Sequence, residues 1–205
     1  MTFQDAINQL VITVDRPDVA NNSNNYMDFL NRAVHEAARR HSWDCMKATA
    51  SVTVLDGNTE VDLPGDFKEF QNGRFCVFDP DGNPVPVYAR TELEQLVPSF
   101  RPPVYFTYTQ DNQGFQVTLP VAASGDTTYT IYYFAYPGTV TDAGQTTPLL
   151  DLYQNMILSK TAALIFQSIN DPVYQVHDAQ FEKELVANSG EDIAVSLPAP
   201  RADKE

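Results

Sequence analysis

Apolar residues near the start of the chain recur every three or four positions, the spacing of one face of an α-helix. From Phe3 to Leu10 this pattern predicts a short helix over residues 3–13. The same spacing returns after an asparagine-rich stretch and predicts a longer amphipathic helix over residues 24–41. The chain is therefore expected to begin with two helices.

The period then falls to two, the repeat of a β-strand. Residues 48–55 alternate between apolar and small polar side chains, and an Asp56-Gly57 turn leads into a second run at residues 59–63. Asp-Gly between two such runs is typical of a tight hairpin. The sequence therefore predicts that these two runs pair with each other.

Turn residues divide the rest of this β-rich block at 79–83, 111–114 and 124–126. They separate five further predicted strands, at residues 74–78, 85–88, 105–109, 115–119 and 127–136. Many short strands separated by turns are typical of a sandwich or a barrel.

The last of these strands, TTYTIYYFAY at residues 127–136, is apolar on both faces. Tyr132 and Phe134 point to one face, and Tyr129 and Tyr133 to the other. Such a strand is either central in a sandwich or apolar outward at an interface. Because tyrosine is enriched at protein interfaces, Tyr132 and Phe134 are candidate intersubunit contacts.

Helical spacing returns after a loop at residues 137–148 and predicts a buried helix over residues 149–167. Asp171-Pro172 begins another helix, with proline at its first position. After Gly190 we expect an extended tail.

These elements predict an α+β fold. One helical bundle is built from both chain ends, residues 1–47 and 141–189, and an antiparallel β-rich domain, sandwich or barrel-like, is inserted at residues 48–140. Residues 190–205 form the extended C-terminal tail.

The charge balance argues against a protein that grips nucleic acid. The chain has 27 acidic and 13 basic residues, a formal net charge of −14, whereas nucleic-acid readers present a basic patch. The net charge is −1 over residues 1–47, −7 over residues 48–140 and −6 over residues 141–205. This surface suits either simple solubility or a channel wall that repels the phosphates of passing DNA.

Candidate catalytic and metal-binding patterns fail on their spacing. His35 and His41 are six residues apart, whereas a zinc-protease helix needs two histidines four apart. Residues 79–84 begin like an EF-hand loop but lack the acid at its twelfth position. No nucleophile elbow or phosphate-binding glycine loop is present in the sequence. We therefore expect no enzyme activity, metal or cofactor.

The sequence also bears on compartment. Cys45 and Cys76 occur singly and are interpreted as reduced thiols. No run approaches the length of a transmembrane helix, and the first residues lack the pattern of a signal peptide. We expect a soluble protein that assembles in the cytoplasm of a cell, with no membrane partner.

Two other functions stay open at this point. The β-rich block is compatible with a module that binds a receptor or carbohydrate through an exposed aromatic platform. The many carboxylates are also compatible with a cell-wall hydrolase that uses an acid pair, for which Asp62 and Asp66 are the candidates.

Three stretches resemble the head-to-tail adaptor proteins of short-tailed phages, the tail tubular protein A family. Residues 29–70 combine a helix ending in paired arginines, a tryptophan, an alternating strand and a closing DLPGDF segment. Residues 131–137, IYYFAYP, are a strand ending on Tyr-Pro. Residues 148–188 contain a helix beginning near DLY and, after DP, a second helix carrying FEKEL.

This resemblance implies a structural adaptor at the head-tail junction of the virion. Members of that family form a ring, usually a dodecamer, under the portal protein, with their helical bundles side by side around the DNA channel. Their β-rich block faces the downstream tail (nozzle) protein. DNA is then expected to pass through the channel on ejection without sequence-specific binding.

The resemblance also suggests how the C-terminal segment acts. In the family this segment clasps the portal, so residues 190–205 are the candidate portal-docking tail. Ile193, Val195 and Leu197 would be its alternating apolar contacts, together with Arg201.

Three residues at the end of the second helix complete the candidate set. Arg39 and Arg40 match the family's basic helix end, and they either form intersubunit salt bridges or complement the helix dipole. Trp43 matches the family's aromatic residue at the helix-to-sheet junction. We interpret it as a core wedge between bundle and β block, not as a site.

Overall fold

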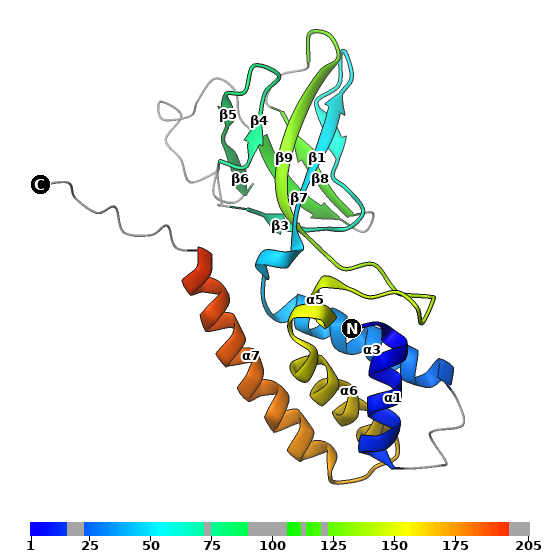
Figure 1. Cartoon of the computed structure of the whole chain (residues 1–205). Helices are drawn as coiled ribbons and strands as arrows, with labels where there is room; N and C mark the ends of the chain where they lie inside the picture. Colours follow the sequence, from blue (N-terminus) through cyan, green and yellow to red (C-terminus); the bar gives the residue numbers. More distant parts are fainter. Residues whose placement is uncertain (16–22, 72–74, 90–105, 112–113, 120–122, 197–205) are drawn as a thin grey trace, which may run out of the picture. The chain divides into compact units, whose positions relative to one another are not determined.

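The computed structural model describes residues 1–15, 23–71, 75–89, 106–111, 114–119 and 123–196 (Figure 1). The chain folds into two compact units. One unit comprises Met1–Met46 together with the chain from Pro137 onward, and the other comprises Lys47–Tyr136. Helices from both chain ends pack together and a β-sheet region lies between them in sequence, so the predicted α+β fold class is confirmed.

The first unit is a helical bundle. Its elements are α1 (Phe3–Val14), α3 (Ser23–Arg40), the short 3-10 helix η1 (Asp44–Met46), α5 (Pro148–Leu152), α6 (Gln154–Ser168) and α7 (Tyr174–Ser196). α6 lies at the centre, where it packs against α1, α3, α5 and α7. The N-terminal helices thus fold against helices that the chain reaches more than a hundred residues later.

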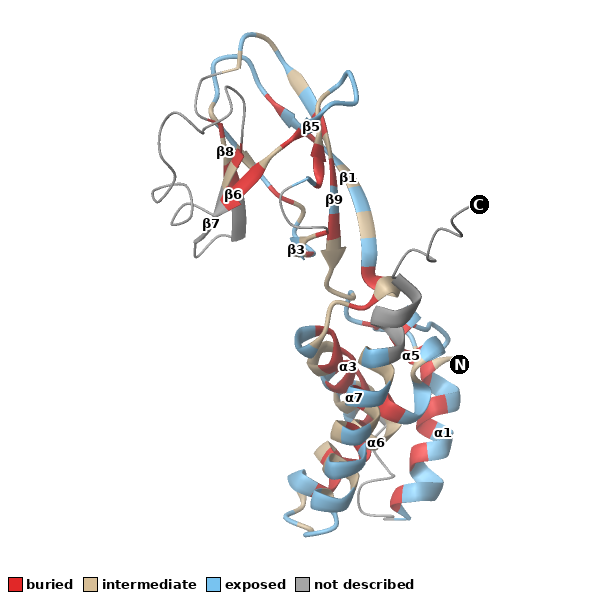
Figure 2. Ribbon diagram, turned by 90° about the vertical axis from the view of Figure 1, so that its left-hand side faces the viewer, coloured by how far each residue is buried: buried red, intermediate tan, exposed pale blue. Residues whose placement is uncertain are grey.

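The start of α1 shows how local sequence sets a helix boundary. The Thr2 hydroxyl accepts a hydrogen bond from the backbone N–H of Asp5 at 3.1 Å, and the Asp5 carboxylate accepts one from the backbone N–H of Thr2 at 3.0 Å. This reciprocal capping box satisfies two backbone donors that the first turn leaves free. The helix then buries one stripe, from Phe3 to Val14, against the bundle (Figure 2).

Two predictions about the C-terminal helices are wrong in part. The single helix expected over residues 149–167 is divided at Tyr153, whose backbone (φ −124°, ψ 42°) leaves the helical range. The tail expected to be extended from Gly190 is helical as far as Ser196. One glycine costs a helix only about 1 kcal/mol, so Gly190 does not end α7.

This correction changes how the portal-docking candidates are interpreted. Ile193 and Val195 belong to α7, so the extended backbone that their alternation implied is not observed. Leu197 and Arg201 lie outside the described residues.

The second unit contains two β-sheets. The five-stranded sheet consists of β1 (Lys47–Val54), β3 (Phe67–Phe70), β4 (Val77–Phe78), β5 (Pro84–Val85) and β9 (Thr127–Ala135). The four-stranded sheet consists of β2 (Glu60–Asp62), β6 (Val87–Ala89), β7 (Phe106–Asp111) and β8 (Gly114–Thr118). All described strand pairs are antiparallel except β6 with β7, which is parallel.

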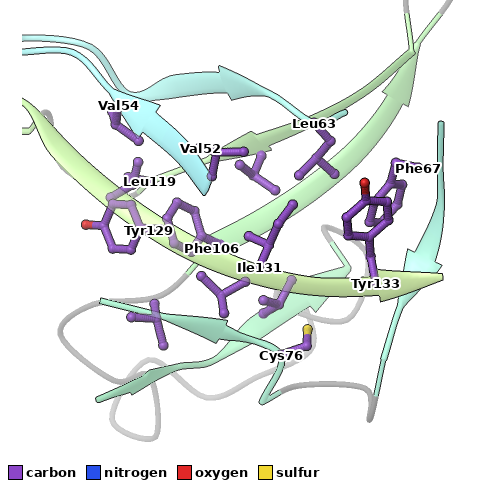
Figure 3. Close-up of a cluster of buried hydrophobic side chains, with 14 residues drawn as sticks. Val52, Val54, Leu63, Phe67, Cys76, Phe106, Leu119, Tyr129, Ile131 and Tyr133 are labelled. Carbon is purple, nitrogen blue, oxygen red and sulfur yellow. The ribbon is translucent and has the colours of Figure 1, made fainter. Parts of the chain in front are cut away.

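One hydrophobic core joins the two sheets (Figure 3). Ile131 and Tyr129 of β9 reach it from the five-stranded sheet, and Phe106 of β7 from the four-stranded sheet. The rings of Phe106 and Tyr129 meet edge to face, with centroids 4.8 Å apart. Contact between side chains of the facing sheets is the arrangement of a β-sandwich.

The hairpin predicted at Asp56-Gly57 is wrong, although the turn itself exists. β1 pairs with β9 and β2 pairs with β8, so the chain leaves one sheet and enters the other. Gly57 takes a positive φ of 78°, and its N–H donates to the carbonyl of Ala123 at 2.9 Å. By contrast, the hairpin predicted around residues 111–114 is confirmed, because β7 and β8 pair antiparallel.

Candidate functional site

The polar face of α3 lines an open groove of about 850 Å³ on the bundle. α6 forms the other wall through Lys160 and Leu164. Three basic side chains of α3 fall on this face because they recur at intervals of three and four positions. We call Arg32, His35 and Arg39 the basic face of α3.

The positive charge of this groove is unevenly neutralised. Lys160 donates to the Asp178 carboxylate of α7 at 2.7 Å, so its charge is paired within the bundle. The side chain of Arg39 is 72% exposed, and its Nη1 lies 3.9 Å from Oε2 of Glu36. Arg32 is exposed, and its guanidinium lies 5.6 Å from the centroid of the Phe29 ring. Arg32 and Arg39 therefore project most of the accessible positive charge.

Arg40, the neighbour of Arg39, has a different environment. It donates to Glu36 at 3.0 Å and to Glu182 of α7 at 3.1 Å, which links α3 to α7. The hydrogen bond to Glu36 and the charge of Glu182 raise the pKa of the Arg40 guanidinium. Arg40 therefore holds the bundle together, whereas Arg39 is the member of the pair that faces solvent. A role for either residue between subunits stays a prediction.

Trp43 is a core residue of the bundle. It is fully buried, and its indole N–H donates to the carbonyl of Ala37 at 3.0 Å. Its ring contacts Tyr153 and His41, with centroid distances of 4.5 and 4.6 Å. The interpretation of Trp43 as a core residue is thus confirmed within this unit.

A second groove, of about 280 Å³, lies between α1, α6 and α7. We call it the Glu184 groove. Its lining includes Leu10, Thr13, Leu158, Ala162, His177 and Glu184. Gln180 donates to Oε1 of Glu184 at 2.5 Å, but Oε2 is buried and has no hydrogen-bond partner among the described residues.

An aromatic patch forms part of the outer face of the five-stranded sheet. Tyr132 is 40% exposed and meets Phe78 edge to face, with centroids 5.5 Å apart. Phe75, just before β4, is 61% exposed. Phe134 is half-buried. β9 lies between β1 and β4, so it is central in its sheet and also apolar on its outer face.

The two residues of the candidate acid pair have different surroundings. Asp62 lies in β2 of the four-stranded sheet. Asp66 accepts a hydrogen bond from the hydroxyl of Tyr133 at 3.0 Å. Burial, aided by this hydrogen bond, raises the pKa of Tyr133 to about 12. Asp66 therefore has a structural partner in the sandwich.

Comparison with known protein families shows the family to which the chain belongs. Residues 1–199 match the family model of the SU10 adaptor protein. The chain belongs to the SU10 adaptor protein family. A search of curated proteins finds no match. This adaptor is thus a phage structural protein, and the resemblance to phage adaptors is confirmed at that level, but not for tail tubular protein A specifically.

Within the described residues, no three histidine, cysteine, aspartate or glutamate side chains gather as a metal site would require. In the same part of the chain, no helix has the length and apolarity needed to cross a membrane.

Sequence reasoning missed two polar residues of the adaptor's bundle. Asn31 is buried, and its side-chain amide bonds both backbone groups of Val140, with distances of 2.9 Å for each bond. Glu184 was not singled out because nothing in its local sequence distinguishes it from the other acids of α7. Both depend on segments that are distant in sequence, so no local signal could have revealed them.

Proposed function

We propose that this adaptor joins the head of a tailed phage to its tail by forming a ring, a dodecamer in the virion, under the portal protein. The family match over residues 1–199 carries the proposal. The two-unit architecture supports it, because one unit can build the ring while the other faces the downstream tail protein. The adaptor then resides at the head-tail junction.

The bundle unit supplies the proposed ring. Its helices present exposed charged and apolar side chains, among them Arg39 on α3 and Val176 and Val186 on α7, which are 69% and 71% exposed. Large apolar side chains left in water on one helix favour a further packing partner. Tyr132 and Phe134 of the sandwich are the corresponding proposed contacts of the second unit.

The end of α7 and the residues after it are the proposed portal anchor. The proposed anchor includes Ile193 and Val195, which lie in the last turns of α7, together with Leu197 and Arg201. The helix supports this role because a preformed helical stem reduces the number of residues that must become ordered on docking.

The net charge of −14 supports a channel that does not retain DNA. A wall with excess negative charge repels phosphates and offers no counterion release to a passing duplex. We propose that DNA crosses the ring without sequence-specific binding.

The test is the solution mass of the protein alone and mixed with portal rings from the same phage, measured by light scattering. A mass jump to a complex of portal stoichiometry is expected. Two truncations then locate the anchor, one after Ser196 and one after Ser189. If neither truncated chain forms the complex, the anchor lies in residues 197–205. If only the chain that ends at Ser189 fails to form it, the anchor lies in residues 190–196.

A control keeps the chain length and replaces Ser196 by alanine, which should leave the complex unchanged. If the wild-type chain and the portal do not associate at micromolar concentrations, the portal-adaptor proposal is refuted.

The exposed aromatic patch favours one second candidate, a virion module that binds a receptor or carbohydrate. Aromatic rings in water are the surface that such a module would present. Tyr132→Ala and Phe75→Ala should then abolish binding on a glycan array. Binding by neither the wild-type chain nor the variants would remove this candidate.

A further inference from the structure

Glu184 is an unusual acid for the surface of a bundle. One carboxylate oxygen is bonded to Gln180 on the same helix, and the other is buried without a partner among the described residues. A buried oxygen that has lost water without gaining a donor is unfavourable, more so when it carries charge. Its position in the lining of the Glu184 groove suggests that a donor arrives from outside the bundle.

The floor of the groove has the form of a docking site. On α6, Leu158 and Ala162 are four positions apart and therefore share one face. Leu10 and Thr13 of α1 form one wall, and α7 forms the other. The α6 side also contributes the polar residues Asn155 and Ser159, so the groove combines apolar contacts with hydrogen-bonding groups and one acid. Such a mixed groove can hold one side of a helix together with one cationic side chain.

The basic face of α3 lies on the other side of α6. Lys160 and Leu164 line the α3 groove, whereas Leu158 and Ala162 line the Glu184 groove. At about 100° per residue, these two pairs point to roughly opposite sides of the helix. One bundle therefore presents accessible arginines on one side and an unsatisfied carboxylate oxygen on the other.

We propose that neighbouring copies of this chain pack with the basic face of α3 of one copy in the Glu184 groove of the next. This inference rests on the proposed function, because it names the contact from which the ring is built. Arg32 or Arg39 pairs with the half-buried carboxylate of Glu184, and a rotation of that side chain brings Oε2 to the donor. The occupant is a second copy because the accessible charge on the opposite side of the same bundle is complementary to the groove.

The symmetry of the contact follows from this geometry. The two complementary surfaces are different and lie on opposite sides of the bundle, so each copy uses both at once. Such a head-to-tail contact repeats from copy to copy and closes into a ring when the rotation allows it. A two-fold contact, in which the same patch meets itself, would instead stop at a dimer.

The test uses charge reversal on each side. Glu184→Lys reverses the groove, and Arg32→Glu combined with Arg39→Glu reverses the face. Each variant alone sets like charges against each other in every contact, so the concentration for half-assembly on portal rings should rise at least about tenfold. Lys183→Glu is the matched control, because Lys183 is exposed on α7 and is not part of the lining of the Glu184 groove.

Mixing the two variants provides the decisive measurement. In an equimolar mixture, the reversed groove meets the reversed face and the native groove meets the native face, so alternating copies should assemble as the wild-type chain does. A misfolded variant could not be rescued in this way. Native mass spectrometry of chains that differ in mass would show the alternation as equal numbers of each.

The outcomes separate this inference from the proposed function. Assembly of the wild-type chain and of both variants at equal concentrations overturns the inference and leaves the adaptor function standing. Loss of assembly in both variants without rescue in the mixture overturns the pairing of these two surfaces. If the wild-type chain fails to assemble on the portal, the proposed function fails and the inference fails with it.

Discussion

Asn31 holds the segment that follows the sandwich against α3, and replacing it should destabilise the bundle strongly. Its Nδ2 donates to the carbonyl of Val140, and its Oδ1 accepts from the N–H of Val140, both at 2.9 Å. The side chain is buried, with 8% of Asn31 exposed. One amide group thus satisfies both backbone groups of a residue 109 positions away.

Asn31→Leu keeps the size of the side chain but removes both hydrogen bonds. The buried N–H and C=O of Val140 then lose their partners, at about 1–3 kcal/mol for each group. Greater apolar burial by leucine offsets roughly 1 kcal/mol. We expect a net loss of about 2–3 kcal/mol, because the segment can recover part of the penalty by admitting water.

Urea unfolding followed by fluorescence of Trp43 is the suitable assay. Trp43 is the only tryptophan of the chain, and it is buried in the bundle, so its signal reports on this unit and not on the sandwich. With a denaturant dependence of about 1–3 kcal/mol/M, the midpoint should fall by about 1–2 M. Asn25→Leu, on the exposed side of α3, is the matched control and should change stability by less than about 0.5 kcal/mol.

A midpoint for Asn31→Leu within about 0.3 M of the wild-type value would refute the reasoning. It would mean that the two hydrogen bonds add nothing beyond what water supplies to Val140. Asn31→Asp is a second test, because it keeps the hydrogen-bond acceptor and removes the donor. Its urea midpoint should be lower than that of Asn31→Leu at neutral pH.

Three further predictions concern single side chains. Arg40→Ala should lower the free energy of unfolding in urea by about 0.5–1 kcal/mol at low salt, and by less at 1 M NaCl, whereas Arg39→Ala should leave it almost unchanged. Equal effects of the two substitutions would contradict the assignment of Arg40 as the link between α3 and α7. Burial raises the pKa of the Cys76 thiol to about 12, so at pH 8 a thiol reagent should modify Cys45 in the native protein and Cys76 only after unfolding. Fast modification of both cysteines would show that the core of the sandwich is open to the reagent. The pKa of Tyr133 is raised from 10.0 to about 12, so its contribution to the free energy of unfolding is complete below pH 10 and is lost as the pH rises towards 12. Tyr133→Phe should therefore lower the free energy of unfolding by about 1 kcal/mol at pH 8 and leave it unchanged near pH 12. A loss of stability that persisted near pH 12 would contradict this assignment.

Periodicity predicted the elements whose signal is local. The helix expected over residues 24–41 is α3 (Ser23–Arg40), because its apolar stripe is uninterrupted and it ends in paired arginines. The turn at 111–114 gave the β7–β8 hairpin, since the two strands that it joins are also neighbours in space. In both cases the partner of each residue lies within a few positions of it in sequence.

Pairing between distant segments was not predictable in the same way. Alternation in β1 shows that it is a strand, but nothing in the alternation names β9 as its partner, so the Asp56-Gly57 turn was assigned a hairpin that does not form. The division of the helix at Tyr153 was also missed, because helical spacing continues across it. The role of Asn31 was not predictable for the same reason, because its hydrogen-bond partner Val140 lies 109 positions away in sequence.

The order of the strands in the sandwich has an evolutionary consequence. The unit begins with β1 and ends with β9, and these two strands pair along their whole length, from Lys47 with Phe134 to Val54 with Thr127. Its entry and exit are therefore only about 5 Å apart. A gene segment that encodes any domain with neighbouring ends can replace it in one recombination event, while both halves of the bundle keep their register. Under the proposed function, lineages that exchange tails would thus acquire a new docking partner without redesigning the surfaces that build the proposed ring.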